Sequence, residues 1–255
     1  MTVAAGVTQF DRSWFSWVGA HGGLVASHLA RAAEPEGGSR HRPALRSLTA
    51  HFLRPVDERL VELAAEPVST SGASTLTRVD AVQDGHTVAT ATVLYGSARE
   101  PGLAWAPEPA PRVPPALDCP LVELPRELVP FAQHLEFRTA DGALPLAGGS
   151  EPSLLAWVRF VDAHLPDDAD LVTLADAMPP GLYGIATTPA PVPSVDLTVH
   201  LSGYLACSPW VLVEQRTLWS VQGWAVDETH LWDERGVRLA EARQTRRVLS
   251  MRRPA

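Results

Sequence analysis

The sequence predicts an α+β fold built from two similar halves, each with a helix followed by an antiparallel sheet. The first observation is a repeat. Leu48-Thr49-Ala50-His51 is matched 149 residues later by Leu197-Thr198-Val199-His200, and the turn glycine Gly85 is matched 151 residues later by Gly236. The second is that each half carries one helical pattern followed by alternating, β-rich segments. An internal repeat of this length indicates a duplicated domain.

Composition and charge narrow the class of protein. The chain has 255 residues, of which 45% are apolar and 20% are charged, as in an ordinary soluble globular protein of one large or two small domains. Its formal net charge is -8, and its basic residues are 21 arginines without any lysine. This acidic excess argues against a basic face that binds nucleic acid.

Targeting and cysteine patterns predict a cytoplasmic protein. Residues 1–15 have neither the basic nor the long apolar region of a signal peptide, and every apolar run is broken before it could span a membrane. Cys119 and Cys207 lie far apart and lack the spacing of metal ligands. We therefore expect a reduced, cytoplasmic protein without a metal or other cofactor and without a membrane span.

The first half is expected to cover residues 1–100. A short segment at 8–17 is predicted to be a strand, and Gly22-Gly23 then open a helix with an apolar face of leucine and alanine, ended by Pro35 and the glycines at 37–38. Three or four strands follow. They are predicted at 45–54, 60–68, 73–83 and 86–98, with Asp84-Gly85 as the hairpin turn between the last two.

Residues 101–130 are expected to be an extended surface linker, because their many prolines cannot donate a regular hydrogen-bond ladder.

The second half, 131–255, is expected to carry the polar site. It is predicted to contain a helix over 170–185, with Asp170 near its N-terminus, and strands at 131–138, 154–161, 194–201, 210–221, 223–233 and 237–249.

Three polar residues of the second half suggest a hydrolytic site. Asp176 falls within the apolar helical pattern, Ser194 stands at the entrance of a strand, and Gln244 is an amide among the alternating residues of the last strand. A carboxylate accepts a proton from water, while a hydroxyl and an amide position the water or the carboxylate by hydrogen bonds. If the three converge, they predict a site that holds and activates a water molecule.

Several short motifs, taken in order, resemble those of the double-hotdog acyl-CoA thioesterases of the thioesterase II family. No single motif is specific, but the ordered set covers nearly the whole chain. The matching residues are Gly22-Gly23 before the first helix, His51-Phe52-Leu53-Arg54-Pro55 at a strand end, Ala81-Val82-Gln83-Asp84-Gly85 at a hairpin, and Leu174-Ala175-Asp176, Ser194-Val195-Asp196 and Ala242-Arg243-Gln244 where the family has its acid, hydroxyl and amide.

The resemblance implies a double-hotdog fold and the hydrolysis of a fatty or related acyl-CoA by direct attack of water. It implies that Asp176 activates the water, that Ser194 takes the place of a threonine, and that Gln244 is the positioning amide. The start of the first helix would bind the substrate through Gly22, Gly23 and His21, with the Gly23 amide holding the thioester oxygen. The chain departs from the family at Thr49, where relatives often have histidine. The resemblance also implies a homodimer or higher homo-oligomer.

The repeat predicts one working site per chain. At the repeat offsets Gln244 corresponds to Val93 and Ser194 corresponds to Leu45, so the first half lacks the polar set. We expect the site at the interface between the halves. Candidate residues lining the acyl chain are Trp157, Met178 and Tyr183. Candidates for the phosphates of CoA are Arg243, Arg246, Arg247, Arg252 and Arg253, although a solvated basic tail is the slightly favoured explanation of these arginines.

Other interpretations remain open at the level of sequence. Asp176 can be a carboxylate that is hydrogen-bonded inside the protein for structural reasons, Ser194 a turn residue and Gln244 an exposed strand residue. A different class of function is a non-catalytic protein that binds acyl groups or acyl-CoA. A hotdog hydratase or dehydratase is disfavoured because the chain has no Gly-Asp-x-Asn-Pro-like loop, and an α/β-hydrolase because it has no G-x-S-x-G motif.

Overall fold

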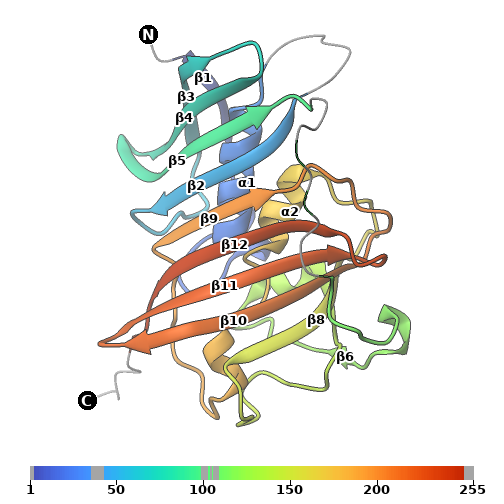
Figure 1. Ribbon diagram of the computed structural model, residues 1–255. Coiled ribbons are helices and arrows are strands. Elements are labelled where there is room, and N and C mark those ends of the chain that lie inside the picture. Colours follow the sequence, from blue (N-terminus) through green and yellow to red (C-terminus); the bar gives the residue numbers. More distant parts are fainter. Residues whose placement is uncertain (1–2, 36–42, 99–102, 104, 106–108, 250–255) are drawn as a thin grey trace, which may run out of the picture.

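One continuous antiparallel sheet organises the molecule (Figure 1). The computed structural model describes residues 3–35, 43–98, 103, 105 and 109–249. Within them the first half comprises β1 (Val3–Thr8), η1 (Arg12–Trp14), α1 (Gly22–Ala32), β2 (Ala44–Phe52), β3 (Val61–Thr70), β4 (Ser74–Gln83) and β5 (His86–Gly96). The second half comprises η2 (Ala116–Asp118), β6 (Leu121–Val122), η3 (Pro130–His134), β7 (Leu135–Thr139), β8 (Ser153–Phe160), α2 (Asp168–Leu174), η4 (Gly181–Gly184), β9 (Asp196–Leu201), β10 (Val211–Val221), β11 (Trp224–Asp233) and β12 (Arg238–Arg247).

The strand order repeats about the junction of β2 and β9. The sheet runs β1-β3-β4-β5-β2-β9-β12-β11-β10-β8-β7-β6, so five strands on each side of the junction follow corresponding orders. At the junction Thr49 pairs with Thr198, its counterpart in the sequence repeat, and the Thr198 hydroxyl donates to Thr49 Oγ1 at 3.2 Å. A pseudo-twofold axis therefore passes between these two threonines, and the predicted duplication is a structural one.

Both helices cover the same face of the sheet and lie side by side (Figure 1). Helix α1 buries Val25, Ala26, Leu29 and Ala30 in the core against the first-half strands. Small residues on this face allow close helix–sheet packing, and the apolar stripe recurs with helical spacing. The predicted hairpin at Asp84-Gly85 is confirmed by positive φ angles of 50° and 74°, as a tight two-residue turn requires.

Two predicted strands differ in the structure. The segment 8–17 is not a strand, since β1 ends at Thr8 and a 3-10 turn follows. The segment 131–138 opens with the 3-10 turn η3 before β7, because Pro130 stands at its first position. The stop predicted at 37–38 lies outside the described residues.

The predicted helix over 170–185 is wrong in extent. It begins earlier, with Asp167 as its N-cap in a capping box with Asp170, and it ends at Leu174. The chain then turns before Pro179-Pro180, which cannot donate the hydrogen bonds of a continuing helix. Asp176 therefore lies in the turn after α2 and not inside a helix.

The proline-rich segment packs on the opposite face of the sheet. Ala116 and Cys119 are buried against Trp157, Trp210 and other residues of the second half, and the Trp157 indole donates to the Pro114 carbonyl at 2.9 Å. The prediction that Trp157 lines the acyl site is therefore wrong, because its side chain points to the face away from the helices. No helix among the described residues is long and apolar enough to cross a membrane.

Candidate active site

Asp176 lies where the two halves meet. Its side chain is 7% exposed, and its two oxygens accept hydrogen bonds from different halves of the chain. Oδ2 accepts from the Gly23 amide of α1 at 2.8 Å, and Oδ1 accepts from Gln244 Nε2 of β12 at 2.5 Å. The two donors, Gly23 and Gln244, lie 153 and 68 residues from Asp176 in the sequence, so distant parts of the chain hold this one carboxylate in place.

Glycine is required at the start of α1 because Asp176 approaches the helix so closely. A Cβ at Gly22 would lie 2.8 Å from Asp176 Oδ2, and one at Gly23 would lie 2.7 Å from the Thr173 carbonyl oxygen and 2.9 Å from Asp176 Cβ. A carboxylate at this position also interacts favourably with the positive end of the helix dipole. The Gly23 amide, assigned from sequence to the thioester oxygen, is occupied by Asp176, whereas we find no acceptor for the Gly22 amide among the described residues.

His21 is buried and uses both ring nitrogens within the protein. Nδ1 accepts from the Leu24 amide at 3.2 Å and so caps α1, while Nε2 lies 2.9 Å from the Asp176 carbonyl oxygen. Burial lowers the pKa of the ring, so the neutral form with its proton on Nε2 fits both contacts. The ring also packs on Phe131, with centroids 4.3 Å apart. These contacts favour positioning of the Asp176 turn by His21 over the expected contact with substrate.

Ser194 and Gln244 lie beside this carboxylate. Ser194 precedes β9 and forms an isolated bridge with Arg246, and Gln244 points from β12 to the helix side of the sheet, where it is 1% exposed. Gln244 Nε2 is 3.4 Å from Ser194 Oγ. The three polar residues singled out in the sequence therefore form one cluster with the helix start.

Arg246 belongs to this polar cluster, a role that sequence reasoning missed. It is 5% exposed, and its Nη1 donates to Ser194 Oγ at 3.0 Å while its Nη2 donates to Gln244 Oε1 at 2.5 Å. The available signal was its position two residues after Gln244, because residues i and i+2 of a strand share a face. Its assignment to the CoA phosphates is wrong, since it is buried.

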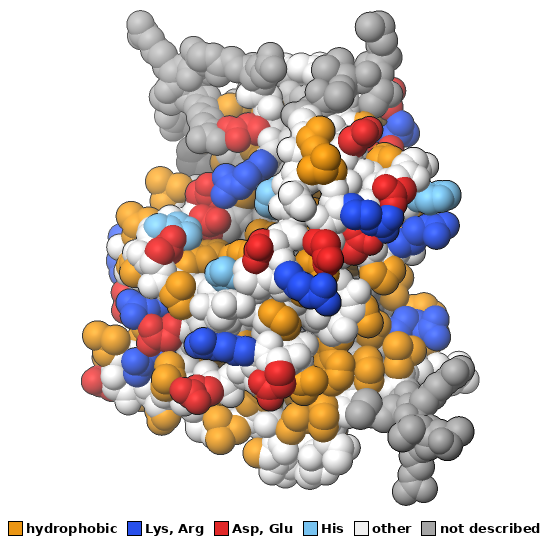
Figure 2. All heavy atoms as spheres, turned by 180° about the vertical axis from the view of Figure 1, so that it is seen from behind, with side chains coloured by type: hydrophobic (Ala, Val, Ile, Leu, Met, Phe, Trp, Pro, Cys, Tyr) orange, Lys and Arg blue, Asp and Glu red, His pale blue; other side chains and the backbone are white. Residues whose placement is uncertain are grey.

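The other arginines near the C-terminus stand apart from the cluster. Arg243 and Arg247 are exposed, and Arg243 pairs with Glu228 at 2.8 Å. Arg252 and Arg253 lie outside the described residues. On the helix side of the molecule acidic and basic side chains are interspersed (Figure 2).

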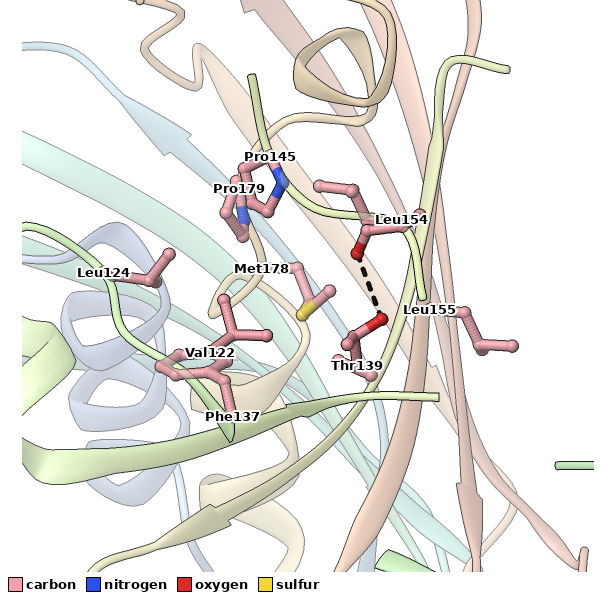
Figure 3. A pocket seen from close by; sticks show the side chains of 11 residues that line it. Val122, Leu124, Phe137, Thr139, Pro145, Leu154, Leu155, Met178 and Pro179 are labelled. Carbon is pink, nitrogen blue, oxygen red and sulfur yellow. Dashed lines mark hydrogen bonds between the residues drawn. The ribbon is translucent and has the colours of Figure 1, made fainter. Parts of the chain in front are cut away.

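A small apolar pocket adjoins the turn after Asp176. Met178 and Pro179 form one wall, and inward-facing residues of β7 and β8 form another (Figure 3). The polar side chain in its lining is Thr139, whose hydroxyl donates to the Ala143 carbonyl at 3.0 Å and is thus satisfied. The lining consists of Val122, Leu124, Phe137, Thr139, Ala143, Pro145, Leu154, Leu155, Ala156, Met178 and Pro179. Met178 and Tyr183 were both predicted to line the acyl site. Met178 lines this pocket, whereas Tyr183 is not among the lining residues and donates its hydroxyl to the Ala190 carbonyl at 2.6 Å.

The first half has apolar residues at the equivalent positions. Val93 and Leu45, the counterparts of Gln244 and Ser194, are both fully buried. The polar cluster thus belongs to the second half, with α1 of the first half completing it. Among the described residues no three histidine, cysteine or acidic side chains are grouped as ligands for a metal ion.

Two protein-family models match the chain. The acyl-CoA thioesterase N-terminal domain matches residues 10–96, and the acyl-CoA thioesterase C-terminal domain matches residues 107–248. No curated protein is significantly similar in sequence.

Solved structures share the fold over nearly the whole chain. A hot dog fold protein of unknown function from Alicyclobacillus acidocaldarius is 23% identical, with a TM-score of 0.87 over 99% of this chain and 97% of that one. The tesB protein of Mycobacterium avium subs paratuberculosis is 17% identical, with a TM-score of 0.77 over 98% and 96%. The acyl-CoA thioesterase II TesB2 of Mycobacterium marinum is 21% identical, with a TM-score of 0.70 over 90% and 89%. At these identities the likeness shows the double-hotdog fold.

Proposed function

We propose that this chain, which belongs to the acyl-CoA thioesterase family, hydrolyses a fatty or related acyl-CoA to the free acid and CoA. The observation that carries the proposal is the Asp176 carboxylate, buried between the two halves and held by the Gly23 amide and Gln244 Nε2. A carboxylate fixed by two donors, next to a hydroxyl and an apolar pocket, suits the activation of a water that attacks a thioester.

In the proposed reaction Asp176 acts as the general base. Each carboxylate oxygen accepts one hydrogen bond from the protein, and an oxygen has lone pairs for a second, so the carboxylate can also accept a proton from water. The water oxygen bonds to the thioester carbonyl carbon while Asp176 takes a proton from the water. The C–S bond of the tetrahedral intermediate then breaks, and the leaving thiolate of CoA receives the proton held by Asp176. Positioned general-base catalysis contributes roughly 10²- to 10⁴-fold to such a rate.

Direct attack by water is favoured over an acyl-enzyme. Ser194 Oγ accepts hydrogen bonds from Arg246 and Gln244, which are donors and cannot remove its proton. A serine nucleophile requires an adjacent base. Ser194 instead positions the water through its hydroxyl.

The amide of Gly22 is the proposed donor to the developing oxyanion. It stands at the N-terminus of α1 beside the Asp176 carboxylate, where a Cβ is excluded. Removal of one such donor costs about 3 kcal/mol in enzymes with a comparable oxyanion hole. The Gly23 amide, expected from sequence to play this part, holds Asp176.

The acyl chain is proposed to enter the apolar pocket beside Met178 (Figure 3). This pocket begins two residues after Asp176 in the sequence, and its lining offers hydrocarbon contacts with a single, internally bonded hydroxyl. Burying an acyl chain gains about 0.8 kcal/mol per methylene.

A cytoplasmic location and a homodimeric or higher oligomeric state remain predictions. Sedimentation analysis would test the oligomeric state.

The deciding experiment is release of free thiol from acyl-CoAs of short, medium and long chain length. Wild type is expected to show a maximum at one chain length, and Asp176→Asn is expected to lose at least about 100-fold in kcat. Asp118→Asn, which changes an exposed aspartate of η2, is the matched control and should retain activity. A folded wild-type protein that binds acyl-CoA but releases no thiol would overturn the proposal in favour of a non-catalytic acyl-binding protein.

A further inference from the structure

Arg246 is a buried cation between two buried carboxylates. Its Nε lies 2.7 Å from Asp227 Oδ2, as an ion pair without the alignment of a hydrogen bond, and its Nη2 lies 3.5 Å from Asp176 Oδ1. Asp227 is 1% exposed, and its other oxygen accepts from the Thr217 hydroxyl at 2.6 Å. A buried charge persists only when it is paired, so Asp227 accounts for the burial of Arg246.

The anchor of this arginine is built into the sheet. Asp227 pairs in register with Gln244 on β12 and with Thr217 on β10, so the three side chains form a row across the face that carries the helices. Arg246 reaches from the next inward position of β12 to this row. Side chains that project from paired strands are held more precisely than those on loops.

The guanidinium decides which way the Gln244 amide points. Arginine has donors only, so the amide oxygen must face Arg246 Nη2, 2.5 Å away. The amide nitrogen then faces Asp176 and Ser194. The flipped amide would bring its oxygen against the carboxylate of Asp176 and its nitrogen against the guanidinium, and both contacts are repulsive.

The guanidinium also sets the direction of the Ser194 hydroxyl. Ser194 Oγ receives N–H groups from Arg246 Nη1 at 3.0 Å and from Gln244 Nε2 at 3.4 Å, which occupy both of its lone pairs. Its proton finds no acceptor among the described residues. Ser194 can therefore donate to a molecule in the site, which is either the attacking water or the substrate.

We propose that Arg246, anchored by Asp227, is a positioning residue that orients the Gln244 amide and the Ser194 hydroxyl for thioester hydrolysis. The inference rests on the proposed function for its kinetic test. Arg246 acts through two other side chains, so its loss lowers the rate of the bound complex and leaves substrate binding nearly unchanged.

The first test compares Arg246→Lys with Arg78→Lys. Lysine keeps the charge but cannot make the fork of contacts to Ser194 and Gln244. We expect kcat to fall about 10- to 100-fold in Arg246→Lys with KM within about twofold, because small misplacements of catalytic groups cost this much. Arg78 lies on β4 with an exposed side chain paired to Glu66, and Arg78→Lys should behave as wild type.

A double-mutant cycle separates positioning from a general structural effect. In a Gln244→Leu background, Arg246→Lys should lower kcat by a smaller factor than in wild type, since one of the two groups on which it acts is already absent. Wild-type activity of Arg246→Lys, or losses that multiply in the double variant, would overturn the inference while leaving the proposed function intact.

A readout without turnover keeps the two proposals distinguishable. The Gln244 side-chain amide protons, identified by NMR through their absence in Gln244→Leu, should exchange with solvent more slowly in wild type than in Arg246→Lys. Equal exchange contradicts the inference even if no acyl-CoA is hydrolysed. Where Arg246→Lys does not fold, Asp227→Asn tests the anchor, and unchanged amide exchange and kcat in that variant would overturn the proposal.

Discussion

At the scale of single residues, burial and hydrogen bonding decide what each polar group does. His21 stands next to the helix glycines, where sequence suggested a contact with substrate. In the structure one ring nitrogen caps α1 and the other binds the Asp176 carbonyl. A neutral imidazole satisfies both contacts, because one nitrogen accepts while the other donates.

The ionisation of His21 predicts a pH dependence of stability. Burial lowers its pKa in the folded protein, whereas the unfolded chain titrates near 6.5. As the pH falls below about 6.5 the unfolded state binds the proton first, so the free energy of unfolding decreases, by up to about 1.4 kcal/mol per pH unit for one proton. His28 and His134, whose pKa values burial also lowers, act in the same direction.

A histidine variant isolates this contribution. His21→Asn retains an acceptor for the helix cap but does not titrate, so its free energy of unfolding, measured in denaturant from pH 7.5 to 5.5, should fall less steeply than that of wild type. Gln222→Asn, an exposed change that adds or removes no titrating group, should keep the wild-type slope. Parallel slopes for His21→Asn and wild type would contradict the assignment.

At the scale of elements, the approach of α1 to the end of α2 creates the site. The two glycines at the start of α1 leave no side chain between the helix and Asp176. The helix start therefore serves both packing and the site, because the Gly23 amide in its first turn also binds the Asp176 carboxylate.

A methyl group at this contact should separate the two elements. We expect Gly23→Ala to destabilise the protein by about 1–3 kcal/mol and to lower kcat for thioester hydrolysis, since its Cβ would meet the backbone oxygen of Thr173. Gly72→Ala is the control, because a Cβ there meets nothing within 4 Å. Thermal unfolding and thiol release measure the two effects. Wild-type values for Gly23→Ala would show that the close approach is not needed.

At the scale of the whole molecule, the second half of the sheet is covered on both faces. The helices cover one face, and the segment around η2 covers the other face of the second half through Ala116, Cys119 and the Trp157 indole. The boundaries 101 and 130 predicted for a linker remain a prediction, but the described part of this segment packs against the second half.

The two cysteines report on this packing. Cys119 is buried, and burial raises the pKa of its thiol, whereas Cys207 is exposed. A thiol reagent should therefore label Cys207 rapidly and Cys119 only when the segment leaves the sheet.

Loss of the indole contact should accelerate the labelling of Cys119. In a Cys207→Ser background, Trp157→Phe removes the hydrogen bond to Pro114 and should raise the labelling rate. Trp219→Phe, which changes an exposed tryptophan of β10, should not. Identical rates in the two variants would show that the indole does not hold the segment.

The sequence by itself determined the duplication, the antiparallel strands and the residues that meet at the site. Periodicity and turn residues act locally, so β2 to β5 and β9 to β12 were predicted within a few residues of their bounds. The repeat offset also identified Thr49 and Thr198 as equivalent, and these two residues pair at the centre of the sheet. The order of short motifs placed Asp176, Ser194 and Gln244 correctly as neighbours.

Only the tertiary structure decided how these residues are connected. The end of α2 at Leu174, the occupation of the Gly23 amide by Asp176 and the burial of Arg246 on Asp227 all depend on contacts between segments far apart in the chain. Local sequence carries little information on such contacts, because an aspartate or arginine in the sequence does not reveal whether its charged group is solvated or buried. Which of the two it becomes is set by the packing of the two halves around it.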